Sequence, residues 1–138
     1  MRPAVLVGLA LIILMANACS ETGATPCPEG SDLWAEYQLF MGRSNQSGEV
    51  VDDAAWDAFL GDTVTPRLSD GLTVLDARGQ WRDSGGTIQK ERSKVLIILA
   101  PPGDQGMGLI GEVSDEYKSR FGQESVLLVV DETCVSFR

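Results

Sequence analysis

The chain of 138 residues contains no histidine. Histidine is the side chain whose ordinary pKa lies closest to neutrality, and it is the general base of most nucleophilic triads. A Ser-His-Asp triad, a Cys-His pair, a histidine-ligated zinc site and a haem held by a proximal histidine are therefore excluded. We expect a protein that binds no haem, zinc or other cofactor and needs no metal ion to fold.

The chain is also poor in basic residues. It carries 11 Lys and Arg against 20 Asp and Glu, a formal net charge of −9. Nucleic-acid binding depends on clustered Lys and Arg, so this balance argues against a DNA or RNA partner. No GxGxxG or GxxxxGK pattern precedes a predicted helix, which argues against a phosphate loop. The length suits one domain, and 43% hydrophobic with 22% charged residues is the composition of a globular chain.

The first 18 residues differ from the rest. Arg2 supplies their only charge, and residues 4–15 form an apolar run that ends in small residues up to Ala18. About a dozen apolar residues match the core of a signal peptide and are too few to span a bilayer comfortably. Cys19 follows directly, and the segment resembles the lipobox of bacterial lipoproteins. We predict a signal peptide at 1–18, a lipid on Cys19 and a periplasmic, membrane-anchored protein; the alternative is plain cleavage and a soluble secreted protein.

Three cysteines are present, an odd number. If Cys19 carries lipid, Cys27 and Cys134 remain, and export takes them to a compartment in which disulfides form. We predict that these two are paired; the alternative is two unpaired thiols. Residues 19–32 are polar and contain prolines and glycines, and we expect them to form a flexible tether ahead of the domain.

Hydrophobic periodicity divides residues 33–138 into six elements. We predict strands at 33–41, 72–82, 87–100 and 124–137, helices at 53–64 and 104–121, and a loop at 42–48. The order β-α-β-β-α-β is that of the ferredoxin-like plan, a single α+β domain with a four-stranded antiparallel sheet and two helices on one face. The first and last strands are antiparallel neighbours in this topology, so Cys27 and Cys134 are expected at the same end of the sheet.

One face of the sheet has no predicted helix to cover it. In the first strand, Tyr37 and its alternate neighbours should lie under the helices, and Trp34 and Phe40 should lie on the open face. Residues 95–100 and 126–130 are apolar on both faces, so the open face exposes more apolar area than a solvated sheet does. We predict that a second copy covers it in a homodimer, with a ligand or the N-terminal arm as alternatives.

Charged residues precede the apolar half of the strand at 87–100. Glu91 could act as an acid or base there, and Arg92 or Lys94 as an anchor for an anion. The alternative is a solvated strand end with Glu–Arg pairing across the hairpin.

Two further side chains are candidates for ligand binding. Arg67, at a helix-to-strand corner, could bind a carboxylate, or it could hold Asp70 or Asp76. Trp81 could stack on a ligand, or it could be packed like most aromatic residues of a strand.

Several phrases of the sequence carry a family resemblance. They are LFMG (39–42), AAWDAFLGDTVTPRLSDGLTVLDARGQW (54–81), ERSKVLIIL (91–99), YKSRFGQESVL (117–127) and CVSF (134–137). In these phrases the chain resembles an exported bacterial family known as domain of unknown function 3574. The resemblance implies a small periplasmic or lipid-anchored protein, and it implies no activity.

We expect a non-enzymatic envelope protein that binds a small molecule or a protein partner. The alternative is a cofactor-free enzyme that uses Glu91, Arg92, Lys94 and Tyr37 in a pocket at the sheet edge. A structural lipoprotein spacer is a third possibility. The absence of histidine argues against the enzyme hypothesis, because histidine supplies many of the bases that work near neutral pH.

The lipid on Cys19 can be tested directly. We expect the intact mass of the membrane-extracted protein to equal that of residues 19–138 plus the acyl and glyceryl groups. A Cys19→Ser variant should lose both the added mass and the membrane association. A soluble wild-type product with an unmodified Cys19 would contradict the prediction.

Overall fold

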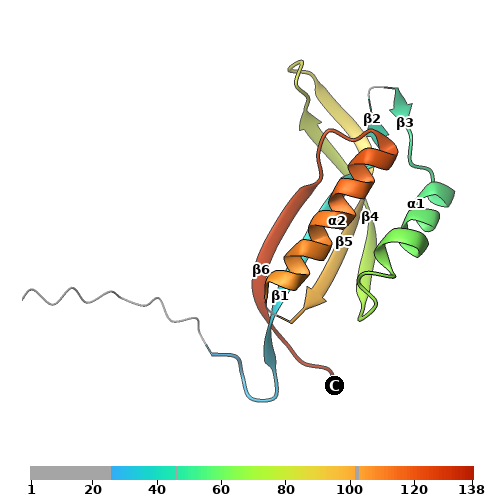
Figure 1. Ribbon diagram of the computed structural model, residues 1–138. Helices are drawn as coiled ribbons and strands as arrows, with labels where there is room; N and C mark the ends of the chain where they lie inside the picture. Colours follow the sequence, from blue (N-terminus) through green and yellow to red (C-terminus); the bar gives the residue numbers. More distant parts are fainter. Residues whose placement is uncertain (1–25, 46, 102) are drawn as a thin grey trace, which may run out of the picture.

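The computed structural model describes residues 26–138 apart from 46 and 102 (Figure 1). In chain order its elements are β1 (Asp32–Gly42), β2 (Ser44–Asn45), β3 (Gly48–Glu49), α1 (Asp53–Phe59), η1 (Leu60–Val64), β4 (Leu72–Arg82), β5 (Ile88–Ala100), α2 (Asp104–Phe121) and β6 (Leu127–Val135). The predicted signal peptide and the lipidation site Cys19 lie outside the described residues.

The four long strands form one antiparallel sheet in the order β4-β5-β1-β6. Helices α1 and α2 lie on the same face of this sheet (Figure 1). The ferredoxin-like α+β prediction is therefore confirmed. Strand β6 is shorter than the predicted span, because residues 122–126 carry the chain from the end of α2 to Leu127, where pairing with Phe40 of β1 begins.

The first helix begins where the sequence predicts. The side chain of Asp52 accepts a hydrogen bond of 2.8 Å from the backbone N–H of Ala55, which caps α1. The prediction was one continuous helix, but its last turn widens into the π-helical segment η1, where the N–H of Thr65 bonds to the carbonyl of Leu60. The wider turn contains two consecutive buried residues, Thr63 and Val64.

The core lies between the sheet and the two helices. Alternate residues of β1 are buried, as the strand period requires. They pack with the inward residues of the helices in one cluster that includes Ala35, Tyr37, Leu39, Met41, Trp56, Phe59, Ile110, Val113 and Tyr117. Four aromatic rings from α1 and α2 meet edge to face or tilted, with centroids 4.9–6.2 Å apart. These rings join the two helices above the sheet.

The start of α2 approaches the sheet closely because it has a glycine there. A Cβ atom on Gly106 would lie 2.9 Å from the hydroxyl oxygen of Tyr37. A larger residue at this position would push the helix away from β1. The glycine that weakens the first turns of α2 therefore permits the packing that buries Tyr37.

The stretch at 42–48 was predicted as a loop, but it contains the short hairpin of β2 and β3. Arg43, just before the hairpin, is only 1% exposed. Its guanidinium donates to the carbonyl of Val51 and pairs with Asp53 at 2.8 Å and Glu49 at 3.3 Å. A buried charge needs such partners, so Arg43 fixes the hairpin against the start of α1.

A disulfide joins Cys27 to Cys134, with their Cα atoms 5.5 Å apart. Leu33 of β1 pairs with Cys134 of β6, so the bond lies where the first and last strands are neighbours. It fastens the described part of the expected tether, residues 26–31, to the sheet. None of the helices within residues 26–138, positions 46 and 102 aside, combines the length and apolar character needed to cross a membrane.

We expect Cys134→Ser to lower the melting temperature of the oxidised protein. The bond joins residues 107 positions apart, and loop-closure entropy for a loop of this length corresponds to about 4–5 kcal/mol. Cys27→Ser should behave in the same way, and reductant should lower the wild type to the level of both variants. Thermal melts followed by circular dichroism test this. Equal melting of the wild type with and without reductant would rule the bridge out.

Candidate functional site

The candidate site lies at the end of the sheet opposite the disulfide. Here β4 and β5 continue as a two-stranded hairpin beyond the last pairing of β1, which joins Gly42 to Ser93. The β2–β3 hairpin and the turn that follows α2 lie beside this projection (Figure 1). Three polar segments that are far apart in the sequence therefore meet at one end of the fold.

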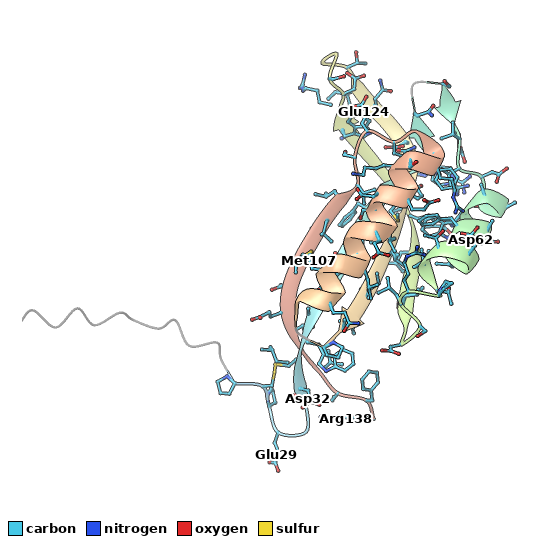
Figure 2. The ribbon with its side chains drawn as sticks, viewed as in Figure 1. Glu29, Asp32, Asp62, Met107, Glu124 and Arg138 are labelled. Atoms are coloured by element: carbon cyan, nitrogen blue, oxygen red, sulfur yellow. A yellow bond between two sulfur atoms is a disulfide. The ribbon has the colours of Figure 1, made fainter. Side chains whose placement is uncertain are left out.

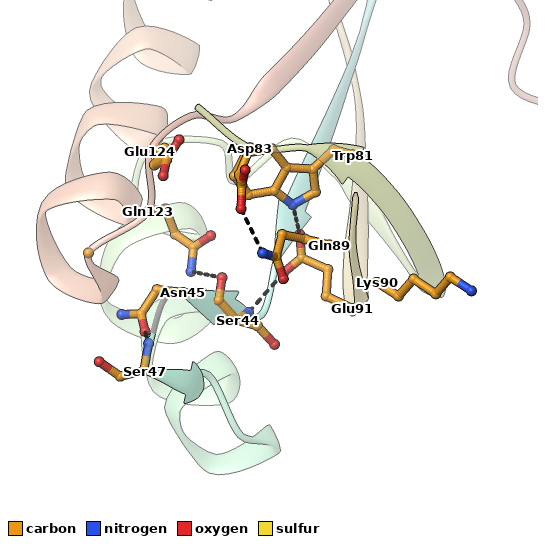
Figure 3. Close-up of a pocket in the computed structure, with 11 residues that line it drawn as sticks. Ser44, Asn45, Ser47, Trp81, Asp83, Gln89, Lys90, Glu91, Gln123 and Glu124 are labelled. Atoms are coloured by element: carbon orange, nitrogen blue, oxygen red, sulfur yellow. Dashed lines mark hydrogen bonds between the residues drawn. The ribbon is translucent and has the colours of Figure 1, made fainter. Parts of the chain in front are cut away.

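These segments enclose a pocket of about 280 Å³ (Figure 3). It is lined by Ser44, Asn45, Ser47, Trp81, Asp83, Gln89, Lys90, Glu91, Gly122, Gln123 and Glu124. Two of these, Trp81 and Glu91, are candidate ligand-binding residues predicted from the sequence, and the structure brings them together.

Glu91 connects the parts of the pocket. One carboxylate oxygen accepts a hydrogen bond of 2.8 Å from the indole N–H of Trp81, and the other accepts one of 2.9 Å from the backbone N–H of Ser44. Instead of the Glu–Arg pair that the alternative interpretation expected, Glu91 binds an indole and a backbone amide. Its carboxylate thereby holds β2 and the side chain of Trp81 to the same point of β5.

Gly42 provides the space for this carboxylate. A Cβ atom on Gly42 would lie 2.5–2.7 Å from the carboxylate atoms of Glu91. The carbonyl of Gly42 accepts a hydrogen bond of 2.8 Å from the hydroxyl of Tyr117 on α2. Burial, together with the negative charge of Glu91, raises the pKa of Tyr117, so its hydroxyl keeps the proton that it donates. Gly42 is thus held between α2 and Glu91.

The end of α2 forms the opposite wall of the pocket. The helix ends at Gly122, whose φ of 63° is left-handed. The side chain of Asn45 donates to the carbonyl of Phe121 at 3.3 Å, and that of Gln123 donates to the carbonyl of Ser44 at 3.1 Å. These two bonds tie the β2–β3 hairpin to the end of the helix.

A second hollow, of about 340 Å³, also borders Trp81. Its lining includes the small residues Ala77, Gly79 and Ser93 and the apolar side chains of Phe40 and Leu127. The two hollows share Trp81, Glu91, Gln123 and Glu124. The indole, fixed by its bond to Glu91, therefore borders both of them.

Arg92 and Lys94 lie on the opposite face of β5 from Glu91 and Ser93, since neighbouring residues of a strand alternate. Arg92 pairs with Glu49 at 3.3 Å. Lys94 is buried, lies 5.7 Å from the ring centroid of Trp56 and pairs with Asp76 at 2.6 Å. This hydrogen bond from Lys94 holds the pKa of the Asp76 carboxyl below its usual range.

Neither Arg92 nor Lys94 lines the 280 Å³ pocket, although Arg92 and Glu91 both border a more open hollow. The cluster of the enzyme hypothesis is not assembled, because Tyr37 is buried under Gly106. Arg67 is also remote from the pocket. It pairs with Glu112 of α2 at 3.1 Å and donates to the carbonyl of Thr63, so it holds neither Asp70 nor Asp76.

The polar residues that complete the pocket were not predicted from the sequence. Ser44 and Asn45 lie in the stretch interpreted as a loop, and Gln123 follows the predicted helix stop. No signal in the sequence connects these segments, because only the tertiary fold brings them together. Within residues 26–138, leaving out 46 and 102, no group of three or more Cys, Asp and Glu side chains is arranged to hold a metal ion.

The space that Gly42 leaves for Glu91 can be tested with a pair of glycine variants. Gly42→Ala should destabilise the protein by about 1–3 kcal/mol, because the added methyl group must displace the carboxylate or the strand. Gly79→Ala is the control, since a Cβ there would come no closer than 3.9 Å to any other group. Urea unfolding measures both. Equal stability of the two variants would show that the contact with Glu91 does not constrain position 42.

Similar proteins support the fold. No curated protein matches the chain. A phage SAM lyase solved in complex with S-methyl-5'-thioadenosine is similar with a TM-score of 0.57 and 18% identity, over 82% of this chain and 95% of that one. CutA from Synechococcus elongatus PCC7942 is similar with a TM-score of 0.51 and 13% identity, over 76% of this chain and 86% of that one. At these identities the likeness shows the fold alone.

The sequence itself matches a family model. The model is described as "Protein of unknown function (DUF3574)", and it matches residues 36–137. This range extends from β1 to the residues that follow β6 and includes every residue that lines the 280 Å³ pocket. The chain therefore belongs to the DUF3574 family, as the phrases in its sequence predicted.

Proposed function

We propose that this protein is an exported, non-enzymatic binding module that takes a small molecule in the pocket beside Trp81. The observation that carries the proposal is the fixed indole, held by Glu91 at the border of two hollows. Ligand sites combine aromatic surface with a few oriented polar groups. The pocket offers this combination in the ring of Trp81 and the side chains of Ser44, Asn45 and Gln123.

The hydrogen bonds in the pocket favour binding over catalysis. A general base must be positioned to reach the proton it takes and have a pKa matched to its task. Each oxygen of Glu91 accepts one hydrogen bond from the walls of the pocket, which fixes the carboxylate in place and leaves lone pairs for a ligand. Asp83 accepts from Gln89 and from the backbone of Thr87, and these bonds lower the pKa of its carboxyl. Both carboxylates suit a role in holding the pocket and its ligand.

Three features support a place in the bacterial envelope. The segment at 1–18 has the composition of a signal peptide, and Cys19 follows it in the position of a lipidated cysteine. The disulfide between Cys27 and Cys134 is typical of proteins that fold in an oxidising compartment. With a lipid on Cys19, the tether ahead of Cys27 would join the domain to the membrane.

A fragment screen by NMR tests the proposal. The three tryptophans give three indole N–H signals, and that of Trp81 reports directly on the pocket. We expect hits that shift the Trp81 signal and leave that of Trp34, which packs against Phe137, in place. Trp81→Ala should abolish binding of these hits, and Trp34→Ala should not. A screen in which no compound moves the Trp81 signal of the wild type would contradict the proposed function.

A second candidate function is self-association through the open face. One row of residues crosses all four strands on this face, through the pairs Leu75–Val95, Val95–Phe40 and Phe40–Leu127. Val95 is only 7% exposed, but Leu75, Phe40 and Leu127 are 47%, 37% and 60% exposed. A contiguous apolar row of this kind favours contact with another surface, and a second copy is the commonest such partner.

Light scattering on the lipid-free domain tests this candidate. We expect the wild type to have the mass of a dimer, and Phe40→Glu to have that of a monomer, because the charge would be buried in the interface. Met107→Glu is the matched control, since Met107 is an exposed apolar residue of α2, on the helix side. A monomeric wild type, or dissociation caused equally by both variants, would contradict the candidate.

A further inference from the structure

The carboxylates around the Trp81 pocket outnumber its cations. Asp83, Glu91 and Glu124 line it from the end of β4, from β5 and from the turn after α2. Lys90 is the one basic residue in the lining, and its side chain extends away from the other labelled groups (Figure 3). The negative charge in the pocket is therefore not matched by positive charge from the lining.

The end of α2 adds to this negative field. An α-helix carries a partial negative charge at its C-terminal end, and α2 ends at the pocket wall with Gly122 in the lining. The basic residues of its last turn are directed elsewhere. Lys118 pairs with Asp115 at 2.8 Å, and Arg120 pairs with Asp62 at 3.0 Å. Neither appears among the residues that line the pocket.

The indole of Trp81 also favours a positively charged ligand. Its N–H is bonded to Glu91 and is not needed by a ligand. The faces of the ring remain, and an indole face attracts a cation or packs against an apolar group. Hydrogen bonds from Gln89 and from the backbone of Thr87 hold the pKa of Asp83 below its usual range, so this carboxylate stays charged at neutral pH.

On the basis of the proposed function, we infer that the ligand is a small organic cation. Its ammonium group would lie among Glu91, Glu124 and Asp83, and its apolar part would lie against the ring of Trp81. A volume of about 280 Å³ suits a compact molecule, because pockets for drug-sized ligands span about 300–1,000 Å³.

The test uses three compounds of matched shape and different charge. Phenethylamine is a cation, phenylacetamide is neutral and phenylacetate is an anion. NMR titrations followed at the Trp81 indole signal should give an affinity for phenethylamine roughly tenfold higher than that for phenylacetamide, with phenylacetate weaker still. Added salt should reduce the preference for the amine, because it screens charges that are exposed to solvent.

Glu124→Gln separates a charge in the pocket from the charge of the whole protein. Glu124 is exposed, and its side chain forms no hydrogen bond or ion pair with any residue that the structure describes, so the substitution should not disturb the fold. We expect it to weaken phenethylamine binding several-fold and to leave phenylacetamide binding unchanged. Glu29→Gln is the control, because it removes the same charge at the opposite end of the molecule (Figure 2), and it should change neither affinity.

The outcomes distinguish the ligand class from the proposed function. If the three compounds bind at Trp81 with equal affinity, or if phenylacetate binds best, the inference of a cation is wrong and the pocket remains a binding site. If Glu29→Gln weakens amine binding as much as Glu124→Gln does, the preference comes from the net charge of the protein and the inference is also wrong. If none of the three compounds and no compound of the fragment screen moves the Trp81 signal, the proposed function itself is wrong.

Discussion

The structure of the candidate site depends on one close contact, that of the Glu91 carboxylate with the backbone of Gly42. The carboxylate atoms lie 2.5–2.7 Å from the place where any other residue at position 42 would have its Cβ atom. From there it reaches the indole of Trp81 and the backbone N–H of Ser44, and Tyr117 holds Gly42 from the helix side. The carboxylate therefore connects β5 with β1, β2 and β4, and Gly42 connects it to helix α2. The bond from the indole to this carboxylate fixes Trp81 at the border of the two hollows.

The molecule separates its charges in a way that suits this arrangement. On the helix side of the sheet, cations are matched with carboxylates: Arg43 with Asp53, Lys94 with Asp76. The first pair joins the start of α1 to the residue after β1, and the second joins the neighbouring strands β4 and β5. At the pocket the carboxylates accept hydrogen bonds from neutral donors instead, as Glu91 does from Trp81 and Ser44. Neutral donors therefore hold the walls of the pocket in place without pairing the negative charge of Glu91 with a cation.

The fold could be predicted from the sequence because its elements have strong local signals. The alternation in β1, the apolar run in β5 and the glycine stop of α2 each identify one element, and the topology then explains why Cys27 and Cys134 meet. The β2–β3 hairpin could not be predicted, because its strands have two residues each and depend on contacts from Arg43, Glu91 and Gln123. The burial of Arg43 has the same cause. Its partners become neighbours only when the chain folds back toward α1.

The candidate site could be predicted only in part, for a related reason. Trp81 and Glu91 stand out because an aromatic residue and a carboxylate near a hairpin are chemically informative wherever they lie. Gly42, Ser44 and Gln123 are ordinary turn residues in sequence, and what they contribute is space and backbone geometry. Arg92 and Lys94 share the sequence signal of Glu91, but strand alternation places them on the helix side of the sheet. There Arg92 pairs with Glu49 and Asp53, and Lys94 pairs with Asp76. The side chains of a charged run on a strand lie on alternating faces and do not form one cluster. This alternation separates Glu91 from Arg92 and Lys94.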